Sequence, residues 1–385
     1  MNFAKLLARR ALQIEASGIR KIFDQAATLK DPIDLSVGQP DYAVPEPVQN
    51  AAIAAIRAGF NRYTPSGGIP ELRRALRERY ERSHGVSLED AVVTSGVSGA
   101  LTLALLALVD PGDEVLVPDP YFVSYKHLTV LCGGTPVYYD TYPDFQIDVR
   151  ALDALVTPKT KVLLAMSPGN PTGACIGEST KKELADFARR KGLVLISDEI
   201  YSLFTYADEH SKLKIKNSKI TSLGAYYPEG TLVLDGLSKS AALTGWRIGW
   251  ALGPQALVEE MTKLQQFTFV HAPSFTQKAA LAALETDLTA AVPVYRKKRD
   301  FMLAGLRAAG YRVAEPGGAF YLFAQVPPAY PHAQAFVEAA LRAGLLLVPG
   351  QVFSRRDTHV RISYAAADQT LSRALEVFQR LAQQV

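Results

Sequence analysis

The sequence predicts an α/β fold: a large domain with a mostly parallel sheet covered by helices on both faces, and a smaller α+β domain. Short apolar runs typical of strands recur between residues 91 and 252, and amphipathic segments separate many of them. After about Gln277 the pattern changes to a few short strands among helices. A chain of 385 residues is also too long for one ordinary core.

The elements of the large domain can be assigned in chain order. Residues 70–83 begin with Pro70 and Glu71 and continue as a charged amphipathic helix. Helices are also expected over residues 98–108 and 179–190. Strands are expected over residues 91–94, 114–117, 161–166, 193–197, 231–234 and 248–252.

The smaller domain begins with a predicted helix over residues 295–309. Its further expected elements are strands at 311–313, 320–323 and 359–363 and helices at 332–343 and 367–383. We therefore predict a large domain over residues 46–284 and a small domain made of residues 1–45 and 285–385, with an N-terminal lid segment.

Composition excludes several classes of function. The net charge of +4 comes from interspersed basic and acidic residues, which does not favour nucleic acid or an anionic membrane as a partner. No apolar stretch approaches the roughly 20 residues of a membrane span, and the N-terminus does not resemble a signal peptide. Cys132 and Cys175 have no metal-binding or redox spacing, so we expect a reduced, cytoplasmic protein.

The segment over residues 231–252 is the most informative part of the chain. Lys239 follows an apolar strand, where burial would lower the pKa of its amine and make it nucleophilic. Arg247 comes eight residues later and offers a cation suited to phosphate. Taken alone, the segment also fits a surface loop followed by a core tryptophan.

Polar residues follow other predicted strands as well. Asn170 lies in a rigid turn over residues 167–173, Asp198 and Tyr201 follow the next strand, and residues 95–99 form a small-residue turn before a helix. Because parallel strands end at one edge of a sheet, we expect these groups in one crevice. Considered alone, the turn over residues 95–99 also fits an ordinary helix cap. Asp198 and Glu199, considered alone, also fit a pair of carboxylates that bind a metal ion. No histidine lies nearby, so no metal is predicted.

Taken together, these motifs resemble the class I/II aminotransferases of the fold-type I pyridoxal-phosphate family, of the aspartate and aromatic type, over nearly the whole chain. The matching segments are residues 37–41, 63–65, 94–96, 119–121, 168–173, 197–201, 238–239, 245–249 and 361–363. The resemblance implies pyridoxal 5′-phosphate (PLP) as cofactor and transfer of an amino group from an L-amino acid to a 2-oxo acid such as 2-oxoglutarate.

The resemblance also implies roles for residues around the cofactor ring. Lys239 would hold PLP as an imine and then move the substrate proton. Asp198 would keep the pyridine nitrogen protonated, while Asn170 and Tyr201 would hydrogen-bond the phenolic oxygen. Tyr121 would stack on the ring, with Phe122 as the alternative.

Other residues would hold the phosphate and the substrate. The phosphate ligands implied by the resemblance are Gly96, Val97, Ser98 and Arg247, with Tyr63 reaching the site of a neighbouring subunit in a homodimer. Arg361 would bind the substrate α-carboxylate beside Gly38, and Ile19 would belong to the lid. The alternative for Arg361 is an ordinary surface arginine.

Two departures from the family pattern bear on phosphate and substrate. Many relatives have a serine three residues before the lysine, where this chain has Gly236, so we expect fewer phosphate contacts. Some relatives that act on acidic substrates have a lysine where this chain has Ser98. With the aromatic segment Phe267, Phe269 and His271, this favours neutral or aromatic donors, without excluding aspartate.

Two other functions remain open at this stage. A C–S lyase or another eliminating enzyme would use the same PLP site residues, and a non-catalytic ligand-binding homologue would keep the fold. The stretch with Lys212, Lys214, Lys216 and Lys219 is interpreted as a solvated loop.

Overall fold

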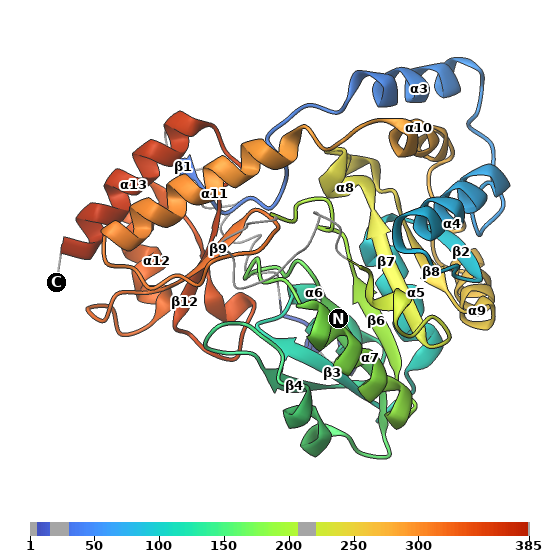
Figure 1. Cartoon of the computed structure of the whole chain (residues 1–385), viewed down its shortest axis with the longest axis horizontal. Helices are drawn as coiled ribbons and strands as arrows, with labels where there is room; N and C mark the ends of the chain where they lie inside the picture. The colour runs from blue at the N-terminus through green and yellow to red at the C-terminus, as the bar shows by residue number, and fades with distance from the viewer. Residues whose placement is uncertain (1–5, 16–30, 207–220, 384–385) are drawn as a thin grey trace.

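The computed structural model describes residues 6–15, 31–206 and 221–383. Ile19 and the lysine-rich stretch from Lys212 to Lys219 therefore lie outside the described residues. A large α/β unit and a smaller unit with its own sheet lie side by side, as the predicted fold class requires (Figure 1). None of the described helices combines the length and the apolar character needed to cross a membrane.

The central sheet has seven strands in the order β2-β8-β7-β6-β5-β3-β4. Strand β8 runs antiparallel to β2 and β7, and the other adjacent pairs are parallel, so the sheet is mostly parallel. The strands are β2 (Asp90–Thr94), β3 (Glu114–Asp119), β4 (Thr135–Asp140), β5 (Thr160–Met166), β6 (Val194–Asp198), β7 (Thr231–Gly236) and β8 (Gly249–Gly253).

Alternating apolar residues bury both faces of this sheet. On β5, Val162 and Leu164 pack in the cluster that contains helix α5 (Gly96–Leu108), whereas Leu163 and Ala165 pack with α7 (Glu178–Lys191). The other helices of this unit are α3 (Glu46–Arg57), α4 (Pro70–His84), α6 (Val123–Leu131), α9 (Gln255–Gln266) and α10 (Ser274–Glu285). The site residues are thus attached to a sheet that is rigidly packed on both sides.

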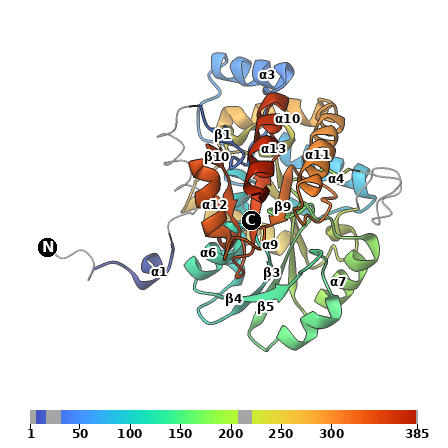
Figure 2. The same ribbon diagram turned by 90° about the vertical axis from the view of Figure 1, so that its left-hand side faces the viewer.

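The smaller unit packs around a three-stranded antiparallel sheet in the order β11-β12-β9. Its strands and helices are β9 (Tyr321–Gln325), β11 (Val348–Pro349), β12 (His359–Ser363), α11 (Ala291–Ala308), α12 (Ala333–Arg342) and α13 (Asp368–Gln383). A second, two-stranded sheet pairs β1 (Ile33–Asp34) with β10 (Leu345–Leu346), which ties the N-terminal part of the chain to this unit. Figure 2 shows α1 (Arg9–Leu12) standing out from the body.

One strand assigned from the sequence was wrong, and β1, β4, β10 and β11 were not predicted. Residues 311–313 form no strand; Val313 makes a single bridge to Ala324, and Pro316 follows too soon for a ladder to continue. Strand β4 was missed because Pro136 interrupts its pattern, yet proline is tolerated there since β4 lies at the edge of the sheet. The domain boundaries at residues 45/46 and 284/285 stay predictions; α3 begins and α10 ends beside them.

Candidate active site at one edge of the sheet

The backbone brings the predicted site residues to one edge of the seven-stranded sheet. Thr94 at the end of β2 and Gly236 at the end of β7 both pair with Gly249, the first residue of β8. Strands β5 and β6 end at the same edge, because they run parallel to β7. The start of α5, the turns after β5 and β6, and the short helix α8 (Leu237–Ser240) therefore meet there.

Lys239 projects from α8 into this edge. Its Nζ donates a hydrogen bond of 2.6 Å to the carbonyl oxygen of Gly38 and lies 5.8 Å from the ring centroid of Tyr201. The pKa of Lys239 is lowered to about 8, chiefly by burial and additionally by the guanidinium cations of Arg361 and Arg247, against the opposing effect of Asp198. Near neutral pH, a far larger fraction of this amine is neutral and nucleophilic than that of an ordinary lysine.

The main chain around Lys239 is held from the other unit. The Tyr42 hydroxyl donates to the carbonyl oxygens of Lys239 at 2.7 Å and Ser240 at 3.0 Å. The preceding residue, Asp41, accepts a 2.5 Å hydrogen bond from the Tyr295 hydroxyl and forms an ion pair with Lys298, both on α11. The segment over residues 37–42 therefore joins α11 to the lysine turn.

Asp198 is buried, with 1% of its surface exposed, and faces the same edge. The Tyr125 hydroxyl donates to its Oδ2 at 2.8 Å, and the backbone N–H of Ile200 donates to its Oδ1 at 3.2 Å. Burial raises the pKa of Asp198 to about 6, only partly offset by these two hydrogen bonds. A cationic group beside it would stabilise the carboxylate form.

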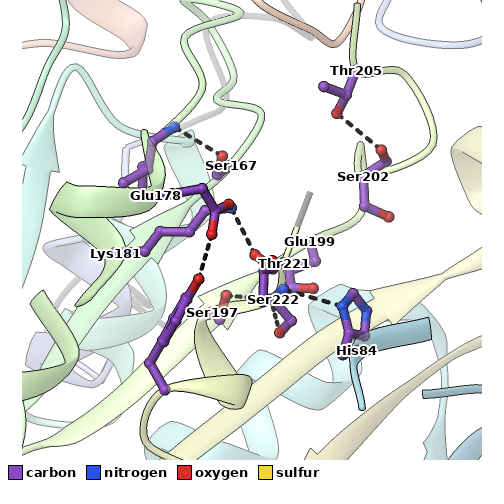
Figure 3. A network of polar contacts seen from close by, with 12 residues as sticks. His84, Ser167, Glu178, Lys181, Ser197, Glu199, Ser202, Thr205, Thr221 and Ser222 are labelled. Atoms are coloured by element: carbon purple, nitrogen blue, oxygen red, sulfur yellow. Dashed lines mark hydrogen bonds and ion pairs between the residues drawn. The ribbon is translucent and has the colours of Figure 1, made fainter. Parts of the chain in front are cut away.

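Glu199 belongs to a separate polar network (Figure 3). Its Oε1 accepts hydrogen bonds from the hydroxyls of Ser197 at 2.7 Å and Ser222 at 2.5 Å, and the Ser222 amide donates to His84. Asp198 and Glu199 therefore have different partners. Across the described ranges, no cluster of three or more His, Cys, Asp or Glu residues is placed to hold a metal ion.

Arg361 lies on β12 and is buried, with 2% of its surface exposed. Its Nη2 donates to the carbonyl oxygen of Ser36 at 2.6 Å and its Nη1 to Asn170 Oδ1 at 3.2 Å. The guanidinium lies between the rings of Tyr321 and Phe353, 4.6 and 4.7 Å from their centroids. Its buried Nε has no hydrogen-bond partner among the described residues. The alternative of a surface arginine is therefore wrong.

Gly38 lies between the lysine and this arginine. A Cβ atom at Gly38 would lie 2.6 Å from the Tyr321 hydroxyl oxygen and 3.7 Å from Arg361 Nη1. Because real Cβ contacts are not that short, only glycine fits without displacing Tyr321. The close approach leaves the carbonyl oxygen of Gly38 beside Lys239 Nζ.

The start of α5 and Arg247 form a cradle for an anion. Gly96 has a φ of +69°, and a Cβ atom there would lie 2.7 Å from Arg247 Nη2. A Cβ atom at Gly249 would lie 2.7 Å from the backbone nitrogen of Val97. The N–H groups in the first turn of a helix have no intrahelical acceptor, so this terminus with a guanidinium beside it suits phosphate. The Ser98 side chain is exposed at the same turn.

Gly236 has a structural explanation. A Cβ atom there would lie 2.9 Å from the carbonyl oxygen of Ile248 and 3.0 Å from Gly249 Cα. No serine side chain fits at this position while β7 and β8 keep their spacing. The phosphate contact that many relatives are expected to make there is replaced by close packing of two backbones.

Tyr121 and Phe122 both lie near the turn that contains Asn170. Tyr121 is buried, and its amide donates at 2.7 Å to the carbonyl oxygen of Phe353, whose ring covers Arg361. Phe122 is half-buried against Tyr125, with the ring centroids 5.6 Å apart. Tyr121 is thus tied to the arginine pocket, whereas Phe122 packs on the residue that holds Asp198.

Tyr63, predicted to reach the neighbouring subunit, and Phe267 and Phe269, predicted to line the substrate pocket, lie at the surface of this chain. Tyr63 is 84% exposed, and its ring contacts His271 at a centroid distance of 5.6 Å. Phe267 is 85% and Phe269 42% exposed. Such a cluster of exposed aromatic side chains is typical of a surface that another protein chain covers.

Sequence reasoning missed four residues that support the site: Tyr42, Tyr125, Tyr321 and Phe353. Tyr125 lies in the first turn of α6, whereas Tyr121 precedes that helix, so no helical spacing relates the two residues in the sequence. Tyr42, Tyr321 and Phe353 contact the site only through the tertiary fold, and no local pattern marks them.

These residues fit PLP. The glycine-lined helix terminus with Arg247 suits its phosphate, the buried Asp198 suits its pyridinium, and Lys239 provides the amine to which its aldehyde can bond. Residues 30–378 match the family model described as aminotransferase class I and II. The chain belongs to this family.

Individual relatives agree with the assignment. The enzyme is 37% identical to the aspartate/prephenate aminotransferase of Thermus thermophilus over 97% of this chain and 98% of that one. It is 34% identical to aromatic-amino-acid aminotransferase 2 of Thermococcus litoralis, over 97% and 98% of the two chains. The structure of the Thermus thermophilus aspartate aminotransferase with maleate superimposes with a TM-score of 0.92 at 36% identity, covering 97% and 99%.

The predicted family, the fold-type I architecture, the PLP cofactor and the aminotransferase reaction are thereby confirmed. Amino acid and oxo acid substrates are consistent with this class of enzyme.

Proposed function

We propose that this aminotransferase moves the amino group of a neutral or aromatic L-amino acid, or of aspartate, to a 2-oxo acid such as 2-oxoglutarate. The observation that carries the proposal is the position of Lys239 between the buried Arg361 and the cradle formed by Arg247 and Gly96. The pKa of its amine is lowered there. The Arg361 guanidinium suits a substrate carboxylate, and the cradle with Arg247 suits the cofactor phosphate.

Arg361 is the proposed binding group for the substrate α-carboxylate. Its guanidinium is held in a fixed plane by two aromatic rings, and the carbonyl oxygen of Ser36 supports one terminal nitrogen. A carboxylate that binds the guanidinium in the plane would replace the weaker 3.2 Å contact with Asn170. The α-carbon of the substrate would then be fixed in orientation relative to Lys239.

Lys239 Nζ is the proposed acid and base. A neutral amine beside the α-carbon can accept its proton and return it to another atom, and a flexible side chain can serve both positions. Two nearby guanidinium cations disfavour a permanently protonated amine. When bound, PLP supplies the electron sink that stabilises negative charge at the substrate α-carbon.

Asp198, Asn170 and Tyr201 are proposed to hold the cofactor ring. Asp198 would keep the pyridine nitrogen protonated; its carboxylate is held by Tyr125, and the pyridinium would offset the cost of burial. Asn170 and Tyr201 would hydrogen-bond the phenolic oxygen. Tyr121 is the proposed stacking residue.

Gly96, Val97, Ser98 and Arg247 are proposed to bind the phosphate. We further propose a homodimer in which Tyr63 reaches the phosphate of the neighbouring subunit; the exposure of Tyr63 and Phe267 supports it. Gly38 is the proposed backbone neighbour of the substrate carboxylate. Cytoplasmic localisation remains a proposal, with which the free thiols of Cys132 and Cys175 agree.

A donor panel tests the proposed reaction. The purified holoenzyme would be incubated with 2-oxoglutarate and, in turn, Asp, Ala, Leu, Phe, Tyr and kynurenine, with glutamate measured as product. We expect Phe, Tyr or Leu to exceed Asp in kcat/KM, because the position of Ser98 carries no cation for a side-chain carboxylate. A strong preference for Asp would refute the neutral or aromatic preference. Pyruvate with released thiol or ammonia would instead indicate elimination.

Reconstitution of the apoprotein tests the lowered pKa of Lys239. The rate at which PLP is captured should rise with pH and level off above about pH 8, because only the neutral amine attacks the aldehyde. Rates would be divided by the rate constant of a simple alkylamine under the same conditions, expressed per neutral alkylamine molecule, so that the ionisation of PLP cancels and the titration of Lys239 remains. A rise that continues toward the ordinary lysine pKa of 10.5 would contradict the prediction.

A further inference from the structure

A hydrogen bond between two tyrosines connects the two sheets at the active site. The hydroxyl oxygens of Tyr201 and Tyr321 lie 2.7 Å apart, and both side chains are buried. Tyr201 follows β6 of the large sheet, whereas Tyr321 is the first residue of β9 in the small sheet. The contact is therefore made only when the two units have their present arrangement.

Tyr321 also contacts the residues on the substrate side of the site. The guanidinium of Arg361 lies 4.6 Å from the centroid of its ring, and its hydroxyl oxygen occupies the space that a side chain at Gly38 would need. Tyr321 pairs with Ser363 in the ladder with β12, two residues from Arg361, so both side chains lie on the same face. Tyr321 thus lies between Arg361 and Tyr201.

We propose that Tyr321 is a positioning residue that orients the Tyr201 hydroxyl toward the cofactor and links it to the side of the site that contains Arg361. The inference rests on the proposed role of Tyr201 at the phenolic oxygen of PLP. If Tyr201 donates its proton to that oxygen, its own oxygen is free to accept one from Tyr321. A donor that itself accepts a hydrogen bond is a stronger donor, especially in a buried site.

The test is the variant Tyr321→Phe, which keeps the ring over Arg361 and removes only the hydroxyl. In the holoenzyme, the spectroscopic pKa of the visible PLP band should rise by about 0.5–1 pH unit, because one supporting hydrogen bond is lost. We expect kcat/KM to fall by about 2- to 10-fold. Tyr311→Phe is the matched control, since it removes a buried hydroxyl that donates to the carbonyl oxygen of Phe378 within the small unit.

A second background separates positioning from a general effect on the fold. If Tyr321 acts through Tyr201, the rise in spectroscopic pKa must vanish when Tyr321→Phe is made in a Tyr201→Phe enzyme. An equal rise in both backgrounds, or none in the wild-type background, overturns the inference while leaving the role of Tyr201 intact. If Tyr201→Phe alone leaves the spectroscopic pKa unchanged, the inference falls together with the proposed role of Tyr201.

Discussion

Replacement of Lys239 with alanine is expected to abolish the visible absorbance band that PLP shows when bound to the wild-type enzyme. Turnover should fall by at least about 10⁴-fold. Both the bond to the cofactor and the proposed proton carrier are lost, and general acid–base catalysis alone contributes about 10²- to 10⁴-fold. The measurements are a visible spectrum of the purified protein and single-turnover rates with an amino donor. Circular dichroism should be unchanged, because the side chain has one hydrogen-bond partner among the described residues, the carbonyl oxygen of Gly38.

Lys182→Ala is the matched control for this variant. Lys182 is an exposed residue of α7, and alanine preserves the helix. It should retain the wild-type spectrum and rate. Turnover that survives in Lys239→Ala at more than a small fraction of wild type would show that another group performs the chemistry.

Replacement of Arg361 with leucine should reduce kcat/KM by about 10²- to 10⁴-fold. Two hydrogen bonds to a charged carboxylate are worth about 1.5–3 kcal/mol each, and every 1.4 kcal/mol is a factor of ten. Leucine leaves no uncompensated charge in the pocket, so the loss reports substrate binding more directly than a charged replacement would. Saturation kinetics with one donor would measure the effect.

A lysine at position 361 refines this test. It preserves the charge but cannot bind a carboxylate through two parallel hydrogen bonds, so we expect it to restore only part of the lost kcat/KM. Arg312→Lys, at an exposed position of the same unit, should be neutral. If Arg361→Leu changed kcat/KM by less than about threefold, another group would have to bind the α-carboxylate.

The sequence predicted the fold class and the edge of the sheet well because strong local patterns determine both. Lys239, Asp198 and Asn170 each follow an apolar run, and parallel strands of that type bring their carboxyl ends together. The family resemblance then identified their proposed roles. Strand β4 was missed because Pro136 interrupts its alternating pattern.

Contacts between distant segments could not be predicted from local patterns. Tyr42 reaches the lysine turn from about 200 residues away in sequence, and Tyr321 reaches Tyr201 from 120 residues away. No local pattern distinguishes either tyrosine, and only the packed units reveal the partners of their hydroxyls. Even the reason for Gly236 became visible only through its distance to β8.

Gly96, Gly236 and Gly249 together constrain how this enzyme can change. Gly236 faces Gly249 across the ladder, and Gly249 in turn lies against the backbone of Gly96 and Val97. A larger residue at Gly236 or Gly249 would push apart two backbones that also position the lysine turn and the helix terminus, and one at Gly96 would be strained at its positive φ and would displace the Arg247 guanidinium. A designer who wished to restore the serine at 236 would therefore have to move β8 as well, so the three positions should vary together or not at all.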